Sequence, residues 1–174
     1  MKKTKQLAQC AVLISLALVL SYMERFIPLQ LVIPLPGIKL GLANIVTLIA
    51  LYLLGAANAC VILVLRCILG AVFSGSVTGL LFSLTGGILA VAVMAVTIRM
   101  NLFSIYGVSI WGAAAHNVGQ IFAAIFLMKS IYVAAYLPWL LLAALVTGYA
   151  TGSMGAGVLK VLTIAYGQNG ERIH

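Results

Sequence analysis

The sequence contains very few side chains that could perform acid–base chemistry. Glu24 and Glu171 are its only carboxylate side chains, and it has no aspartate. Paired-carboxylate catalysis needs two acids in one site, and Mg²⁺ or Ca²⁺ sites usually contain at least one or two carboxylates. Because Glu171 lies in a polar tail close to the C-terminus, we do not expect it to join Glu24. The sequence therefore predicts no catalytic residue, no metal site and no cofactor in this chain, and a role other than that of an enzyme.

A second group of polar side chains stands within a long apolar run. His116, Asn117 and Gln120 fall within about one helical turn, and His116 and Gln120 share a face because they are four residues apart. Exposure of such a polar face to lipid has a high free-energy cost, so we expect the face to contact protein, water or a ligand. Hydrogen bonding between helices is the alternative explanation. A metal role for His116 is disfavoured because His174 is the only other histidine.

Arg66 is a cation inside another apolar run. An arginine at mid-membrane costs about 2.5–3.5 kcal/mol on insertion scales, so it should be paired or face a cavity. It could bind a phosphate or carboxylate of a substrate, or it could be a structural residue tied to backbone carbonyls or to Glu24. The candidate substrate-binding residues are Arg66, His116, Asn117, Gln120, Lys39, Asn44, Glu24 and Ser76.

The composition places these residues in a membrane protein. The chain has 174 residues, of which 64% are hydrophobic and 7% are charged, whereas soluble domains are about 25% charged. This excludes a soluble enzyme, a disordered segment and a nucleic-acid-binding protein. The net charge of +8 would suggest a nucleic-acid partner in a soluble chain, but here it indicates orientation in the lipid bilayer.

Six apolar runs predict an all-α integral membrane bundle. Each run is near the length of about 20 residues that crosses the hydrocarbon core. The runs are about 7–23, 40–54, 57–72, 77–98, 104–128 and 138–159. They form one domain over residues 1–160, followed by a short polar tail at 161–174. In the last run, Gly148 and Gly152 have the four-residue spacing that permits close approach of helices.

We expect the chain to lie in the plasma membrane. The distribution of its positive residues predicts that both termini lie on the cytoplasmic side. This arrangement places six cations inside, namely Lys2, Lys3, Lys5, Arg99, Lys160 and Arg172. Arg25, Lys39 and Lys129 then face outward, so the inside carries the excess. The proline-rich loop between Glu24 and Lys39, the turn at 74–76 and the segment 129–138 all lie on the outer side. A site assembled by these loops would open outward.

Several stretches carry a resemblance to a known family. They are Pro36–Asn44, Arg66–Gly79, Phe82–Gly87 and Gly112–Gln120. With these stretches, the chain resembles the Gx transporter family, also called heptaprenyl diphosphate synthase component I, over about residues 7–160. That family is related to the substrate-binding S-components of energy-coupling factor (ECF) transporters.

The resemblance to S-components implies a specificity subunit of an importer. Such a subunit captures a vitamin-like small molecule from outside and docks through its first helix onto a transmembrane T-component, which works with two cytoplasmic ATPases. S-components carry an Ala-xxx-Ala docking motif, and this chain has Ala11-xxx-Ser15 at that place. The chain contains no GxxxxGK[ST] phosphate loop, so another chain would have to hydrolyse ATP.

The family's enzyme name implies an alternative. The chain could be an accessory membrane component of a heptaprenyl diphosphate synthase, in isoprenoid or menaquinone side-chain biosynthesis. That enzyme class uses Asp-rich motifs, which this sequence lacks. A purely structural membrane anchor is a third possibility. If the chain binds a ligand, the excess of Arg66, Lys39 and Arg25 over Glu24 predicts an anionic quinone-, vitamin- or isoprenoid-precursor-like molecule.

Overall fold

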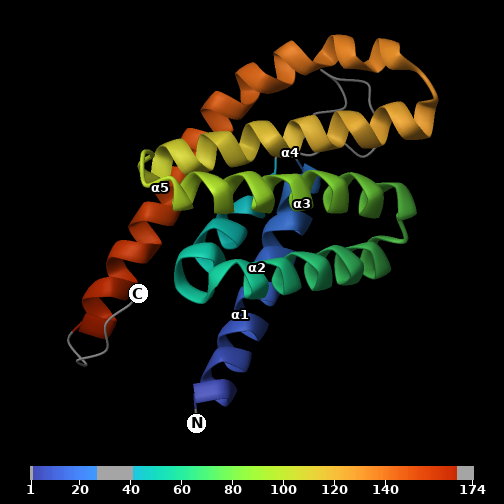
Figure 1. Ribbon diagram of the computed structural model, residues 1–174. Coiled ribbons are helices and arrows are strands. Elements are labelled where there is room, and N and C mark those ends of the chain that lie inside the picture. Colours follow the sequence, from blue (N-terminus) through green and yellow to red (C-terminus); the bar gives the residue numbers. More distant parts are fainter. Residues whose placement is uncertain (1, 27–40, 168–174) are drawn as a thin grey trace.

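The computed structural model describes residues 2–26 and 41–167, and within these ranges every regular element is a helix (Figure 1). The long helices are α1 (Lys2–Met23), α2 (Asn44–Ser74), α3 (Val77–Arg99), α4 (Ile105–Met128) and α5 (Leu137–Gly167). Two short 3₁₀ helices, η1 (Glu24–Phe26) and η3 (Ile131–Tyr136), follow α1 and precede α5. The described chain has five helices that are long and apolar enough to cross a membrane. The predicted all-α class is confirmed.

The structure has five long helices where the sequence predicted six spans, and the difference lies at Gly55. The predicted span 57–72 and residues 44–54 of the predicted span 40–54 fall within α2, which is interrupted at Gly55 (φ 81°, ψ 173°). Glycine adopts this backbone conformation readily because it has no Cβ, and the chain changes direction there (Figure 1). Residues 44–54 would extend about 16 Å as a helix, roughly half of the 30 Å hydrocarbon core. Six complete spans therefore remain a prediction.

α3 and α4 pack together at the centre of the bundle (Figure 1). A Cβ placed on Gly119 of α4 would lie 2.7 Å from the Gly86 Cα and 2.7 Å from the Thr85 carbonyl oxygen of α3. A Cβ on Gly112 would lie 2.6 Å from the Met94 side chain. Only glycine permits so close an approach of the two backbones, so these positions hold the two central helices at a fixed separation.

α5 packs on α4 at Gly148 and Gly152, where the sequence predicted a close helix contact. A Cβ on Gly148 would lie 2.6 Å from the Ile110 Cα, and one on Gly152 would lie 3.1 Å from the Tyr106 Cα. The hydroxyl groups of Ser109 and Thr151 form a buried hydrogen bond of 2.7 Å between the same helices. The expected close approach at Gly148 and Gly152 is confirmed. α5 itself continues to Gly167, past the predicted end of the last span at 159.

α1 lies at the edge of the bundle. Within the described residues it packs only against α2 and η1, and Ala11 and Ser15 are exposed on it. Ser15 Oγ donates to the Ala11 carbonyl oxygen at 3.0 Å, a bond within the same helix. The small-residue pair is therefore open to lipid or to a partner helix.

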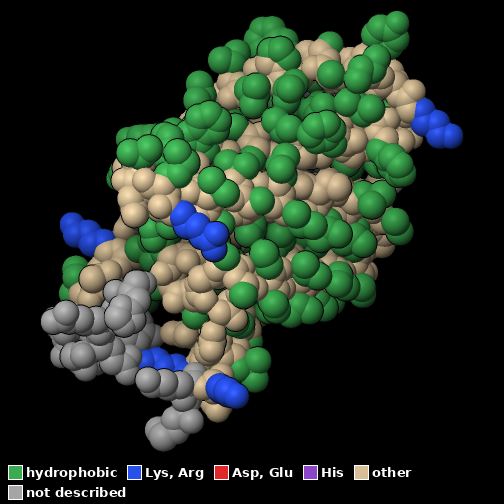
Figure 2. Space-filling view, viewed as in Figure 1, with side chains coloured by type: hydrophobic (Ala, Val, Ile, Leu, Met, Phe, Trp, Pro, Cys, Tyr) green, Lys and Arg blue, Asp and Glu red, His purple; other side chains and the backbone are tan. Residues whose placement is uncertain are grey.

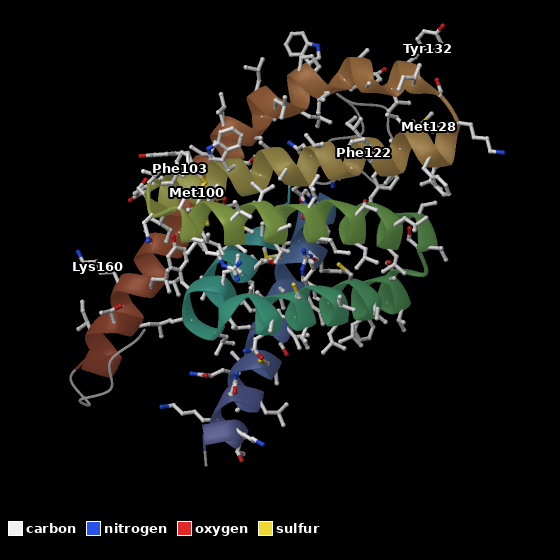
Figure 3. All side chains as sticks on the ribbon, viewed as in Figure 1. Met100, Phe103, Phe122, Met128, Tyr132 and Lys160 are labelled. Carbon is white, nitrogen blue, oxygen red and sulfur yellow. The ribbon has the colours of Figure 1, made fainter. Side chains whose placement is uncertain are left out.

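The charged side chains are unevenly distributed along the bundle. Figure 2 shows most of the visible Lys and Arg side chains toward the end where α1 begins and α5 finishes. Lys160 and Met128 lie at opposite ends of the molecule (Figure 3), and Lys129 directly follows Met128. This asymmetry agrees with the predicted orientation, which itself remains a prediction. Lys39 and Arg172 lie outside the described residues.

Candidate functional site

Five residues from separate parts of the chain form what we call the central polar cluster: Glu24, Gly41, Asn44, His116 and Gln120. The Gly41 backbone N–H donates a hydrogen bond to Oε1 of the Glu24 carboxylate. A Cβ on Gly41 would lie 2.9 Å from Asn44 Nδ2 and 3.4 Å from His116 Nε2. Gln120 Nε2 is 3.0 Å from His116 Nε2. The structure thus brings together four of the predicted binding residues.

The cluster lies near the middle of the two central helices. His116 is midway along α4, and a Cβ on Gly86, near the middle of α3, would lie 2.8 Å from His116 Nδ1. The exposed fractions of Glu24, Asn44, His116 and Gln120 are 4%, 7%, 3% and 0%. Polar groups are therefore concentrated deep inside a bundle that exposes many large hydrophobic side chains, as the face in Figure 2 shows.

The start of α2 explains how Asn44 reaches this depth. Gly41 has φ +84°, a left-handed conformation that favours glycine. The turn that it begins is closed by a hydrogen bond of 2.8 Å from the Asn44 N–H to the Gly41 carbonyl oxygen. Ala43, at the N-cap, supplies no side-chain hydrogen bond, and Glu24 Oε1 accepts from the Gly41 N–H just before this end of the helix. The helix consequently begins beside His116, inside the bundle.

Several buried polar atoms have no hydrogen-bond partner among the described residues. They are Asn44 Nδ2 and Oδ1, Thr47 Oγ1, Gln120 Oε1 and Arg66 Nε. A buried donor or acceptor left without a partner costs about 1–3 kcal/mol, and native proteins contain only a few such atoms per hundred residues. The atoms on Asn44 and Gln120 belong to the central polar cluster, and Thr47 lies one turn beyond Asn44 on the same face of α2. This concentration of unsatisfied atoms is typical of a ligand-binding site.

Thr47 differs from the other described threonines in its surroundings. The hydroxyl groups of Thr85, Thr97 and Thr147 each donate to the carbonyl oxygen four residues earlier, at 2.7, 2.9 and 3.0 Å. This is the usual arrangement for threonine within a helix. Thr47 is 1% exposed, and its hydroxyl makes no such bond. No described residue therefore uses its hydrogen-bonding capacity.

Gln120 and His116 are in hydrogen-bond contact along one face of α4. Gln120 Nε2 lies 3.0 Å from His116 Nε2, and the direction of this hydrogen bond depends on the tautomer of the imidazole ring. Gln120 keeps its Oε1 atom as a buried acceptor.

Arg66 lies at the contact between α1 and α2. Its Nη1 atom is 3.5 Å from Ser21 Oγ, and the residue is 6% exposed. The contact is thus with Ser21 and not with Glu24, which the structural alternative had suggested as a partner. Ser21 and Glu24 are three residues apart near the end of α1, so the single buried cation and the single buried carboxylate of the described chain lie near the same end of that helix.

The remaining predicted residues have other surroundings. Asn117 Nδ2 donates to the Leu140 carbonyl oxygen at 2.7 Å, which ties α4 to α5. Ser76 is the N-cap of α3, where its Oγ accepts from the Gly79 N–H at 3.0 Å. Ser76 precedes Gly86 by ten residues, about 15 Å of helical rise, so the turn at 74–76 does not reach the cluster.

Three residues at or beside the site were not predicted from the sequence as binding residues: Ser21, Gly41 and Thr47. The signal for Thr47 was its position three residues after Asn44, which puts both on one helical face. No spacing in the sequence signals Ser21 or Gly41, because their partners are distant along the chain. Within the ranges 2–26 and 41–167, no group of three His, Cys, Asp or Glu side chains is placed to hold a metal ion. The chemistry that the cluster offers is hydrogen bonding to a small polar group.

Comparison with known proteins identifies the family. A family model described as heptaprenyl diphosphate synthase component I matches residues 13–158, a range that contains every member of the central polar cluster. No curated protein and no solved structure matches the chain significantly. The relation to ECF S-components therefore stays a prediction. Because the match covers most of the chain, the protein belongs to the heptaprenyl diphosphate synthase component I family.

Proposed function

We propose that the chain is the accessory membrane component of a heptaprenyl diphosphate synthase and binds a small organic molecule in its central polar cluster. The observation that carries this proposal is the family match over residues 13–158, because a component I implies a second component. The cluster adds a binding site to that role, since Asn44, Thr47 and Gln120 present buried polar atoms that no described residue satisfies.

The sequence indicates that the partner chain, and not this chain, carries out the catalysis in the proposed synthase. Chain elongation with diphosphates depends on Mg²⁺ held by carboxylates, and this chain has only two carboxylate side chains. The partner would therefore supply the catalytic site. A heptaprenyl chain is strongly apolar, and each buried CH₂ group favours the membrane by about 0.8 kcal/mol. A membrane component would keep the synthase where its product accumulates.

Copurification tests this proposal. The tagged chain is extracted from its native membranes in mild detergent, and the associated proteins are identified by mass spectrometry. The fraction is then incubated with Mg²⁺, isopentenyl diphosphate and an allylic diphosphate. We expect a soluble, Asp-rich partner and elongation to a long prenyl diphosphate. Extraction without such a partner, together with no elongation, would contradict the synthase role.

A second candidate is the specificity subunit of an ECF-type importer, with a T-component and two ATPases as partners. The observation that favours it is the exposed position of Ala11 and Ser15 on α1, which packs against α2 alone among the long helices of the described chain. Small residues on an open helical face permit close contact with a transmembrane partner. In this role the cluster would bind the transported molecule.

Substitution on α1 distinguishes the two candidates. We expect Ala11→Leu and Ser15→Leu to remove copurifying ATPases if the chain is an importer subunit, because the larger side chains would separate the helices. Val12→Leu is the matched control, since Val12 is 66% exposed on the same helix and is already large. If no ATPase copurifies with the unchanged protein, the importer role is wrong.

Arg66 is the buried cation that bears on the predicted negative charge of the ligand. Lys39 lies outside the described residues, and Arg25 lies in the short helix η1. The buried charges that remain are Arg66 and Glu24, which are of opposite sign. The proposal of an anionic ligand thus depends on Arg66, whose Nε atom has no described partner.

A further inference from the structure

We propose that the central polar cluster recognises the amide, imide or ureide edge of a neutral small molecule, with Asn44 as the residue that contacts this edge. The inference depends on the proposed ligand-binding function and adds the chemical class of the ligand. It differs from the expectation of an anionic ligand, which considered only charged residues.

The first step is the position of the helix start. Asn44 is the first residue of α2, yet it lies beside His116 at the middle of α4. A helix that begins inside a membrane bundle brings polar backbone and side-chain groups to a depth without bulk water. Interrupted helices of this kind form binding sites in many membrane proteins. The exposed fraction of Asn44 is only 7%, so its amide points into the protein interior.

The second step is the pattern of donors and acceptors. The Asn44 amide offers one acceptor, Oδ1, and one donor group, Nδ2, and neither has a partner among the described residues. Gln120 Oε1 is a further acceptor, and the Thr47 hydroxyl can act either way. An amide or imide edge presents an N–H beside a C=O, so it can pair with both atoms of Asn44 at once. A carboxylate or phosphate only accepts, and it would leave Asn44 Oδ1 and Gln120 Oε1 unsatisfied.

The third step is the backbone donor that is already in use. Glu24 Oε1 accepts a hydrogen bond from the Gly41 N–H, and Glu24 is 4% exposed. This N–H near the start of α2 is therefore not available to a carboxylate or phosphate ligand. A ligand that can both donate and accept is favoured over one that only accepts.

Matched pairs of small molecules test this inference on the full chain in detergent. The probes are nicotinamide with nicotinate, and succinimide with succinate, so that each pair differs mainly in amide or imide against carboxylate. We expect nicotinamide and succinimide to raise the thermal unfolding temperature, and each carboxylate to bind about tenfold more weakly or not at all. The reason is that the carboxylates cannot donate to Asn44 Oδ1.

Substitutions assign the effect to Asn44. Asn44→Ala is expected to abolish the stabilisation by nicotinamide and succinimide. The unfolding temperature without probe reports folding, and it should not fall greatly because Asn44 makes no described side-chain hydrogen bond. The matched control is Asn58→Ala, on the same helix, whose Nδ2 donates to the Leu54 carbonyl oxygen at 2.7 Å. This control should respond to the probes like the unchanged protein.

Three results would overturn the inference: carboxylates that stabilise as well as the amides, probes that all fail to stabilise, or an Asn44→Ala protein that keeps the response. The first of these would leave the proposed ligand-binding function intact and change only the ligand class. The loss of the synthase partner in the copurification experiment, by contrast, would contradict the proposed function without affecting amide recognition.

Discussion

Replacement of Thr47 by valine should make the ligand-free protein more stable, although it deletes a buried polar group. Thr47 is 1% exposed, and its hydroxyl has no hydrogen-bond partner among the described residues. An unsatisfied buried hydroxyl costs about 1–3 kcal/mol, and valine puts a methyl group of similar size in its place. We therefore expect Thr47→Val to raise the free energy of unfolding by about 1 kcal/mol, the lower end of that range.

Thr97→Val is the matched control for this prediction. Thr97 is also buried in a central helix, at 7% exposure, but its hydroxyl is 2.9 Å from the Val93 carbonyl oxygen and 3.0 Å from that of Met94. Side-chain hydrogen bonds in membrane proteins contribute about 0.6 kcal/mol on average. We expect Thr97→Val to lower the free energy of unfolding by roughly that amount.

The assay is equilibrium unfolding of the purified, ligand-free chain in mixed micelles, followed by circular dichroism as the fraction of denaturing detergent rises. The two variants should shift the unfolding midpoint in opposite directions. If Thr47→Val destabilises the protein as much as Thr97→Val, the Thr47 hydroxyl has a partner within the protein. The reasoning that assigns it to a ligand would then be refuted.

Three further substitutions test the packing and the site. Gly119→Ala should destabilise the bundle by about 2–3 kcal/mol in the same unfolding assay, because its Cβ would lie 2.7 Å from the α3 backbone, whereas Gly157→Ala meets no atom within 4 Å and should not destabilise it. Asn117→Ala should cost about 1 kcal/mol, since it removes the 2.7 Å bond to the Leu140 carbonyl oxygen; an unchanged midpoint would contradict that role. Gly41→Ala should abolish nicotinamide binding measured by thermal shift, because its φ of +84° and its Cβ contact of 2.9 Å with Asn44 Nδ2 exclude a side chain; retained binding would be inconsistent with the described cluster.

Much of the helical framework could be predicted from local signals. The predicted spans 77–98 and 104–128 correspond closely to Val77–Arg99 and Ile105–Met128. Both helices begin after serine residues, Ser76 and Ser104, whose hydroxyls accept from backbone N–H groups three residues later. Serine at an N-cap is a strong local preference. These boundaries depend on neighbouring residues, so the sequence alone was sufficient to locate them.

The arrangement inside the bundle depends on distant residues and was harder to predict. The sequence indicated Glu24, Asn44, His116 and Gln120 as candidate binding residues, and the structure brings all four together. It could not indicate that α2 starts at the middle of α4, because the depth of a helix start depends on tertiary packing. For the same reason, the sequence suggested Glu24 as a structural partner of Arg66, and the contact in the structure is with Ser21.

The most direct test of the account is native mass spectrometry of the gently extracted protein, with Asn44→Ala and Asn58→Ala proteins prepared in parallel. The account predicts that the unchanged protein and Asn58→Ala retain a neutral small molecule containing an amide, imide or ureide group, and that Asn44→Ala does not. Bare protein in all three samples, or a retained anion whose occupancy is unaffected by Asn44→Ala, would contradict the claim that the buried polar cluster is a ligand site centred on Asn44.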